Sequence, residues 1–249
     1  MLTELLQINT AQIILVVTII FIAYMVKGIS GFGSGLIAIP LLAFFLPLAV
    51  VVPTLGLLSY SGTIYQSISL RKQVAWRDIL PLLPFSLMGI VLALWLLVNL
   101  SADTLAFSLG AFIVAYSLYS LFKLTQPRGG KRWAILAGSL GGFISAIFGT
   151  GGPFYVIYLK LRELNKAEFR ASIAMVFLID GGARITGYAL SGLYNKQVLW
   201  LLILLWPVLV LGMWLGHRLH NQINQKKFNQ IVNVLLCVSG VLLMVKATT

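Results

Sequence analysis

Hydrophobic and polar positions alternate along this chain in long blocks. Most of the apolar blocks carry hydrophobic residues on every face, as helices in lipid do and amphipathic helices do not. They lack the period-two alternation that a membrane β-barrel requires. Ten apolar runs are visible, at 11–26, 34–50, 52–70, 78–98, 103–124, 133–148, 151–160, 170–190, 197–217 and 228–246. The pattern therefore predicts an all-α polytopic membrane protein with eight to ten membrane segments.

Composition agrees with this pattern and removes a large class of functions. The 249 residues are 59% hydrophobic and only 10% charged, whereas a soluble domain carries roughly 25% charged residues. A transmembrane helix takes about 20 residues, so the segments fill the chain and leave no room for a soluble domain. An ordinary soluble enzyme is excluded.

Two sequence features occur twice in the same order, which indicates a duplication. A glycine-rich break reads G-I-S-G-F-G-S-G at 28–35 and G-T-G-G-P at 149–153, and the string K-Q-V-x-W occurs at 72–76 and at 196–200. The offsets are 118 and 124 residues, about half the chain. We therefore expect two membrane repeats, at 1–126 and 127–249, each of about five segments with glycine-broken helices or re-entrant hairpins.

The basic residues predict how these segments are oriented. The chain has 18 Lys and Arg against 6 Asp and Glu, a net charge of +12. Alternating segments place fifteen of the 18 on one face, which the positive-inside rule assigns to the cytoplasm; Lys196 and Lys246 fall outside, and Arg184 lies within a run. Both termini are then outside, and repeats with an odd number of segments are inverted, as in many secondary transporters. A parallel arrangement would force the basic residues of 160–170, or those after His217, outside.

The glycine breaks are the first candidate site. Backbone N–H and C=O groups freed within a membrane are tolerated only inside the protein or along a polar cavity. A break also exposes the N-terminus of the next helix, which favours an anion. Pro153 suits the first turn of such a helix, and Ser34 and Thr150 supply hydroxyl donors. The candidate anion-binding residues are Gly31, Phe32, Gly33, Ser34, Gly35, Gly149, Thr150, Gly151, Gly152 and Pro153. The alternative is that these glycines only let helices pack closely.

Two charged residues within one run form the second candidate site. Asp180 and Arg184 are four residues apart and share a helix face. Charges at that depth are costly unless they are paired or line water. Arg184 could bind an anion through its fixed fork of donors, while Asp180 orients it or takes up a proton in a coupled cycle. The alternative is a neutral internal ion pair that fastens helices.

The first half has no matching charged pair and offers polar residues instead. These lower-ranked pocket candidates are Ser61, Thr63 and Gln66. Their hydroxyl and amide donors suit an oxyanion, although Ser and Thr also bond to their own helix backbone.

Enzymatic and metal chemistry find little support. His217 and His220 form H-x-x-H but have no Cys, Asp or Glu nearby to complete a metal site. There is no nucleophile–base pair and no phosphate-binding loop of the Walker type. We therefore expect no metal, no cofactor and no enzymatic activity.

The chain resembles the sulfite exporter TauE/SafE family of membrane proteins. The residues that carry the resemblance are G-I-S-G-F-G-S-G-L-I-A-I-P at 28–40 and F-G-T-G-G-P at 148–153, although Ser34 interrupts the first glycine series and Pro153 ends the second. The resemblance implies transport of small sulfur-containing or organic anions, such as sulfite or sulfonates, across a bacterial inner membrane.

Together these features predict a secondary transporter for a small anion that works by alternating access. Two alternatives stay open: an anion channel, and a membrane scaffold or assembly protein without a solute. The expected partners are the anion, a proton or ion gradient and the lipid bilayer. No nucleic acid is expected, and a homodimer is the assembly left open.

Overall fold

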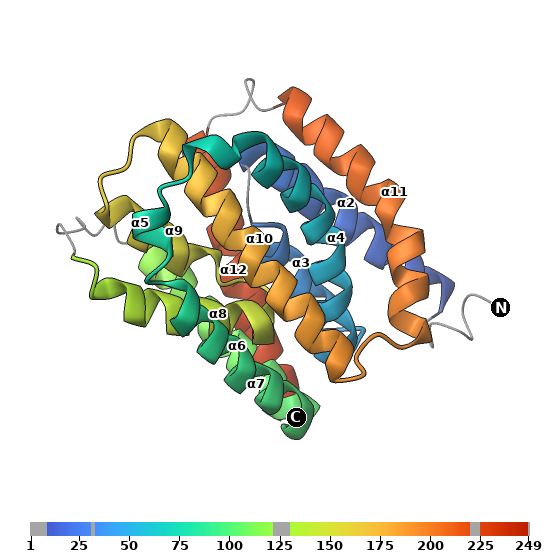
Figure 1. The fold of residues 1–249 in the computed structure, drawn as a ribbon. Helices are drawn as coiled ribbons and strands as arrows, with labels where there is room; N and C mark the ends of the chain where they lie inside the picture. The colour runs from blue at the N-terminus through green and yellow to red at the C-terminus, as the bar shows by residue number, and fades with distance from the viewer. Residues whose placement is uncertain (1–8, 31–32, 122–129, 220–224, 249) are drawn as a thin grey trace. The chain divides into compact units, whose positions relative to one another are not determined.

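The computed structural model describes residues 9–30, 33–121, 130–219 and 225–248, and within these ranges all regular structure is helical (Figure 1). The helices of the first half are α2 (Thr10–Ser30), α3 (Ser34–Leu42), α4 (Leu48–Leu70), α5 (Trp76–Ile79), α6 (Leu83–Asn99) and α7 (Ala102–Leu121), with a 3-10 turn at Arg71–Gln73. Those of the second half are α8 (Trp133–Phe148), α9 (Gly152–Leu161), α10 (Lys166–Leu190), α11 (Lys196–Leu219) and α12 (Gln225–Thr248). The all-α prediction is confirmed.

The helices follow the apolar runs closely, with two differences. The run 34–50 is not one helix, because α3 ends at Leu42 and α4 begins only at Leu48. Pro47 lies in the connection and has no N–H with which to continue the first helix; its carbonyl instead accepts bonds from the first turn of α4. The run 78–98 is divided between α5 and α6.

Length and composition show which helices can cross a bilayer. Within the described residues, four are long and apolar enough, at Thr10–Ile29, Ala102–Tyr119, Lys166–Leu190 and Lys196–Leu219. Shorter apolar helices lie at Leu48–Ser61, Leu83–Asn99, Trp133–Phe148 and Leu236–Thr248. The chain is a multi-pass membrane protein.

The chain forms two compact units, which are described separately. Unit 1 contains Met1–Thr54, Leu100–Leu124 and Tyr194–Thr249, and unit 2 contains Leu55–Asn99 and Thr125–Leu193. In unit 1, α2 packs on α11 and α7 packs on α12; in unit 2, α6 packs on α8, and α10 packs on α6 and α9. Figure 1 shows α2 in blue beside α11 in orange.

Glycines allow these helices to approach each other closely. A Cβ at Gly216 of α11 would collide with the carbonyl of Met25 on α2. In unit 2, a Cβ at Gly142 of α8 would collide with the backbone of Ser86 on α6. Small residues serve this purpose in membranes, where apolar surface alone does not drive helix association.

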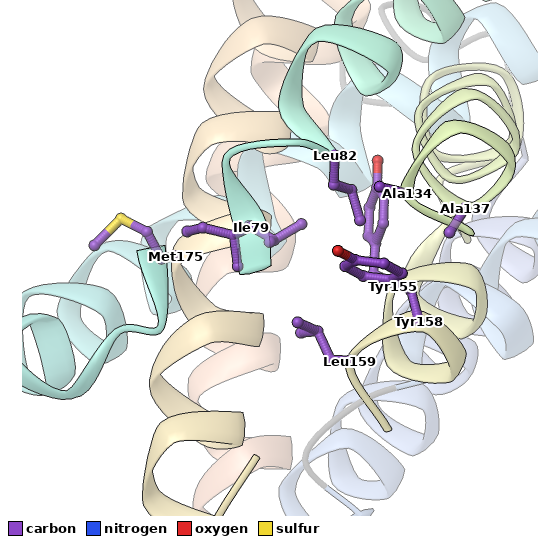
Figure 2. Packing of buried hydrophobic residues seen from close by; sticks show 9 residues of the cluster. Ile79, Leu82, Ala134, Ala137, Tyr155, Tyr158, Leu159 and Met175 are labelled. Atoms are coloured by element: carbon purple, nitrogen blue, oxygen red, sulfur yellow. The ribbon is translucent and has the colours of Figure 1, made fainter. Parts of the chain in front are cut away.

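The core of unit 2 surrounds the short helix α9. Tyr155, Tyr158 and Leu159 of α9 are fully buried and point into a cluster with residues of α5, α8 and α10 (Figure 2). The other members are Ile79, Leu82, Ala134, Ala137, Met175 and Val176. This cluster holds α9 in place, and α9 in turn positions the candidate site described below.

A capping box fixes where α10 begins. The Asn165 side chain accepts hydrogen bonds from the N–H groups of Ala167 and Glu168, and Glu168 accepts one from the Asn165 N–H. Such a box satisfies N–H groups that have no intrahelical partner. The register of α10, and hence the position of its charged residues, is thereby set from its first turn.

We predict that Gly216→Ala destabilises the α2–α11 pair, because its new methyl group meets backbone that cannot move aside. Overpacking costs about 1–3 kcal/mol, and each kcal/mol lowers the midpoint of thermal unfolding by about 2–4 °C in a chain of this size. The measurement is thermal unfolding of the detergent-purified protein. Gly130→Ala is the control, because a Cβ at Gly130 meets nothing within 4 Å. Equal midpoints for the two variants would contradict the packing role.

Candidate functional site

The second glycine break is the turn between α8 and α9. α8 ends at Gly149, whose φ of 65° lies in the left-handed region that glycine adopts without strain. Its N–H bonds to the carbonyls of Ile144 and Ser145. α9 begins at Gly152, and Pro153 lies in its first turn as the sequence predicts.

The turn folds α9 back along α8. A Cβ at Gly151 would collide with the Gly141 carbonyl and the Ser145 side chain, and one at Gly141 would collide with the Tyr155 ring. Both glycines are therefore needed for close packing, which is the alternative that the sequence left open for Gly151. Gly152 is less constrained, because a Cβ there would lie 3.2 Å from the end of the Phe177 ring.

The Asp180 carboxylate on α10 lies at the centre of a buried polar cluster in unit 2. Its Oδ1 accepts hydrogen bonds from Tyr155 Oη at 2.6 Å and Ser86 Oγ at 3.1 Å, and its Oδ2 accepts one from Ser145 Oγ at 2.6 Å. Arg184 Nε lies 3.2 Å from the same Oδ2. The Asp180 side chain is only 1% exposed. Helices α6, α8 and α9 each supply one hydroxyl donor to this one carboxylate.

Two residues of α10 also bind the end of α8. Arg184 Nη1 donates to the Ser145 carbonyl at 2.8 Å, and Tyr188 Oη donates to the Ala146 carbonyl at 2.5 Å. The last carbonyls of a helix have no intrahelical donor, and a cation near a helix C-terminus is stabilising. Arg184 thus closes the broken end of α8 as well as pairing with Asp180.

Two buried polar groups beside this turn have no hydrogen-bond partner among the described residues: Thr150 Oγ1 and Arg184 Nε. Thr150 is 5% exposed. Arg184 Nε is within ion-pair distance of Asp180, but no hydrogen bond forms between them. Unsatisfied buried polar groups are costly, so an acceptor beside this turn would satisfy Thr150 Oγ1 and would give Arg184 Nε a hydrogen bond in addition to its ion pair.

The first glycine break lies in unit 1. Gly33 precedes α3 with a φ of 93°, and its carbonyl accepts a bond from the Ile37 N–H. Ser34 is buried and Gly35 is half-buried. Gly31 and Phe32 lie outside the described residues. The role of this break in anion binding stays a prediction.

The lower-ranked candidates of the first half bond to their own helix. Ser61 Oγ donates to the Leu58 carbonyl at 2.9 Å, and Thr63 Oγ1 donates to the Ser59 carbonyl at 3.1 Å. This is the local bonding that competes with a ligand role. The side chain of Gln66 lies outside the described part of the structure.

Sequence reasoning missed Ser86, Ser145, Tyr155 and Tyr188. Each contributes one hydroxyl from within an apolar run, and only the packing of α6, α8 and α9 against α10 brings these groups together. The presence of Asp180 within an apolar run was the signal for them, because a buried carboxylate requires hydrogen-bond donors from neighbouring helices.

Metal ligands are not gathered in the part of the chain that the structure describes. Within those ranges, no group of three or more His, Cys, Asp or Glu residues is placed to hold a metal ion. His217 is exposed at the end of α11, and His220 lies outside the described residues.

Several membrane-crossing helices, a broken helix pair and a buried ion pair are together typical of polytopic membrane transporters. The family comparison agrees. The chain belongs to the sulfite exporter TauE/SafE family, whose model matches residues 16–243. The resemblance found in the glycine motifs is thus confirmed. A transporter family is also in line with the expectation that the chain is not an enzyme.

Two relatives resemble the chain over most of its length. "Probable inner membrane transporter protein TsaS" of Comamonas testosteroni is 30% identical over 174 residues, 68% of this chain and 72% of the relative. "Probable sulfite/organosulfonate exporter TauE" of Cupriavidus necator is 26% identical over 199 residues, 76% of this chain and 77% of the relative. No solved structure matches the chain significantly.

We predict that Tyr155→Phe lowers stability, because it removes a hydroxyl that donates to Asp180 at 2.6 Å. Leaving a buried polar group short of a partner costs about 1–3 kcal/mol. The midpoint of thermal unfolding should fall for this variant. It should stay unchanged for the control Tyr119→Phe, because the Tyr119 side chain is exposed. A Tyr155→Phe protein as stable as the parent would show that the Asp180 cluster does not need this donor.

Proposed function

We propose that the protein is a secondary transporter of a small anion that binds at the start of α9, beside the α8–α9 turn. Sulfite, a sulfonate or a related organic anion is the expected substrate. The observation that carries the proposal is a pair of buried donors, Thr150 Oγ1 and Arg184 Nε, that have no hydrogen-bond partner among the described residues, although Arg184 Nε is ion-paired with Asp180. Both flank the same turn, because Arg184 bonds to Ser145 and the turn begins four residues later at Gly149.

The chemistry of the turn suits an oxyanion. The N-terminus of α9 presents the positive end of its helix dipole to a negative charge, although Pro153 has no N–H and the Phe154 N–H donates to the Gly151 carbonyl at 3.2 Å. A hydroxyl at Thr150 and a guanidinium at Arg184 add donors of two further kinds. Sulfite and sulfonates carry three oxygens, so several donors can bind one ion at once. The name of the Cupriavidus relative, a probable sulfite/organosulfonate exporter, supports this substrate class.

The length of α9 supports a site near the membrane centre. Its ten residues span about 15 Å, half of a hydrocarbon core about 30 Å thick. The C-terminal end of α9 is polar: Lys160 is exposed, and Arg162 Nε pairs with Asp78 Oδ1 at 2.7 Å. A helix whose polar end lies at the membrane surface begins near the middle, where transporter sites lie.

Helix order and pairing support two inverted repeats at 1–126 and 127–249. In each half a long helix is followed by a glycine break, a short helix and three further long helices. The first helix of each half packs on the third long helix of the other, α2 on α11 and α8 on α6, and the last helices, α7 and α12, pack on each other. Two related halves would show this reciprocal packing of corresponding helices. Movement of one half against the other would supply alternating access.

Contacts within each unit also support the proposed topology. In unit 2, two segments proposed to be cytoplasmic meet, because the Ala75 N–H donates to Ser172 Oγ at 2.9 Å. In unit 1, Lys246 Nζ donates to the Phe44 carbonyl at 3.0 Å, and both residues are proposed to be outside. The excess of basic residues then places both termini outside a bacterial inner membrane.

A scaffold without a solute accounts for the glycines in the helix pairs, but it leaves Thr150 Oγ1 and Arg184 Nε without a hydrogen-bond acceptor among the described residues. A channel would use the same site with a continuous water path. A saturable anion flux that is coupled to an ion gradient would distinguish the proposed transporter from a channel and from a scaffold. The expected driving force is a proton or ion gradient, because the sequence lacks a Walker-type motif for ATP.

We predict that Thr150→Val weakens anion binding and Thr150→Ser preserves it. A hydrogen bond to a charged group contributes about 1.5–3 kcal/mol, so the Val variant should lose about 10- to 150-fold in apparent affinity. The measurement is uptake of sulfite and of methanesulfonate into proteoliposomes under an imposed proton gradient. Failure of the parent protein to transport either anion would contradict the proposal.

Arg184→Lys keeps the charge that neutralises Asp180 but loses the forked donor geometry. We expect it to reduce the same uptake strongly. The matched control is Arg170→Lys on the same helix, because Arg170 is exposed and should tolerate the change. Equal uptake by both variants would remove Arg184 from the site.

The topology is tested with cysteines on the two faces. In a protein whose native cysteine is removed by Cys237→Ser, we expect a membrane-impermeant maleimide to label Ser191→Cys in intact cells and to leave Gly130→Cys unlabelled until the cells are opened. Both positions are exposed, so the difference reports the side of the membrane. The reverse labelling pattern would invert the orientation.

A further inference from the structure

We infer that Asp180 takes up one proton for each monovalent anion bound, which makes transport an electroneutral symport of anion and proton. This inference rests on the proposed function and adds its coupling stoichiometry. It is built on the composition of the Asp180 cluster, on the position of Arg184, and on the cost of net charge within a membrane.

The cluster is electrically neutral before an anion arrives. Its groups come from three neighbouring helices and from α10 itself: Ser86 from α6, Ser145 from α8, Tyr155 from α9, and Arg184 and Tyr188 from α10. α4 also packs against this part of α10, with the uncharged ring of Tyr60 beside Gly181 and Gly182. Among these described residues, the ionised pair is Asp180 and Arg184, which are 1% and 13% exposed. A monovalent anion bound beside Arg184 would bring the net charge to minus one. An uncompensated charge at this depth is costly.

The hydroxyl groups around Asp180 can form hydrogen bonds both to an ionised and to a protonated carboxyl group. Three of its four partners are hydroxyls, from Ser86, Ser145 and Tyr155. A hydroxyl both donates and accepts, so it can turn toward a protonated carboxyl group, whereas an N–H can only donate. Ser86 Oγ and Tyr155 Oη already lie 2.8 Å apart, and either can be the donor between them. The cluster therefore suits both protonation states of Asp180.

Arg184 can be shared between Asp180 and an anion. Its Nη1 is held by the Ser145 carbonyl at 2.8 Å, so its position does not depend on Asp180. Its Nε has no hydrogen-bond partner and is paired with Asp180 Oδ2 only at 3.2 Å. An anion that takes this donor weakens the pairing of Arg184 with Asp180, and a proton on the carboxylate then keeps the site neutral.

The geometry favours a proton over a metal cation as the coupling ion. The Arg184 guanidinium already lies beside Asp180 Oδ2, where a metal cation would have to bind to neutralise this carboxylate. A proton needs no such place, because it forms an O–H bond on the carboxylate itself. It comes from water on one face and returns to water on the other, while Arg184 keeps its charge and the anion is chemically unchanged.

The test measures charge and protons together on the unaltered protein. Proteoliposomes contain a pH-sensitive dye, potassium and valinomycin set the membrane potential, and the anion is methanesulfonate, with sulfite in parallel. Methanesulfonate stays monovalent over the usable pH range. We expect one proton to move with each methanesulfonate in the same direction. The steady-state accumulation should follow the pH gradient and ignore the potential, whereas a carrier of one net charge would change its accumulation about fiftyfold per 100 mV.

The possible failures are distinguishable. Anion flux without proton movement, or accumulation that follows the potential, overturns the electroneutral coupling and leaves the proposed transporter intact. Absence of flux for both anions overturns the proposed function and the coupling with it.

A matched pair of variants assigns the proton to Asp180. Asp180→Asn imitates the protonated state, so we expect it to move anion without protons and to follow the membrane potential. Asp103→Asn is the control, because Asp103 is an exposed residue of α7 and its loss should keep one proton per anion. If Asp180→Asn transports anion with the parent's proton count, the proton is carried elsewhere and the assignment fails. The measurements on the unaltered protein test the coupling even if this variant does not fold.

Discussion

A backbone break within a lipid-embedded protein must have its polar groups paired, and the structure of unit 2 depends on this constraint. α8 stops at Gly149, and side chains from α10 bind its last carbonyls, with Arg184 on Ser145 and Tyr188 on Ala146. An arginine buried for this purpose requires a counter-charge, which Asp180 supplies from the same helix. Asp180 in turn requires donors, and three neighbouring helices provide one hydroxyl each. The break thus accounts for the whole polar cluster.

The same break explains why two kinds of glycine occur together in one motif. Gly149 has a backbone conformation that other residues adopt only with strain, and Gly151 approaches α8 so closely that a methyl group would collide with it. Neither role requires a ligand. We propose a ligand instead because the buried Thr150 hydroxyl has no hydrogen-bond partner among the described residues. Packing and binding are therefore assigned to different residues of one short segment.

Much of the fold and part of the site could be predicted from the sequence. Apolar runs predicted the helices because lipid requires continuous hydrophobic length, and Asp180 and Arg184 stood out because buried charge is costly. The end of α3 was missed, although Pro47 marked it. Ser86 and Tyr155 were also missed, because a single hydroxyl in an apolar run looks the same whether it faces its own backbone or a carboxylate on another helix.

The sequence alone determined what is local and additive: an all-helical membrane chain, the positions of its helices, its family, and the two residues whose charge requires an explanation. Tertiary structure decided what depends on distance between segments far apart in the chain. It placed Ser86, Ser145 and Tyr155 around Asp180, turned Arg184 toward the end of α8, and left the Thr150 hydroxyl without a hydrogen-bond partner among the described residues. Hydrogen bonds act over about 3 Å, so their partners become known only when the helices are packed.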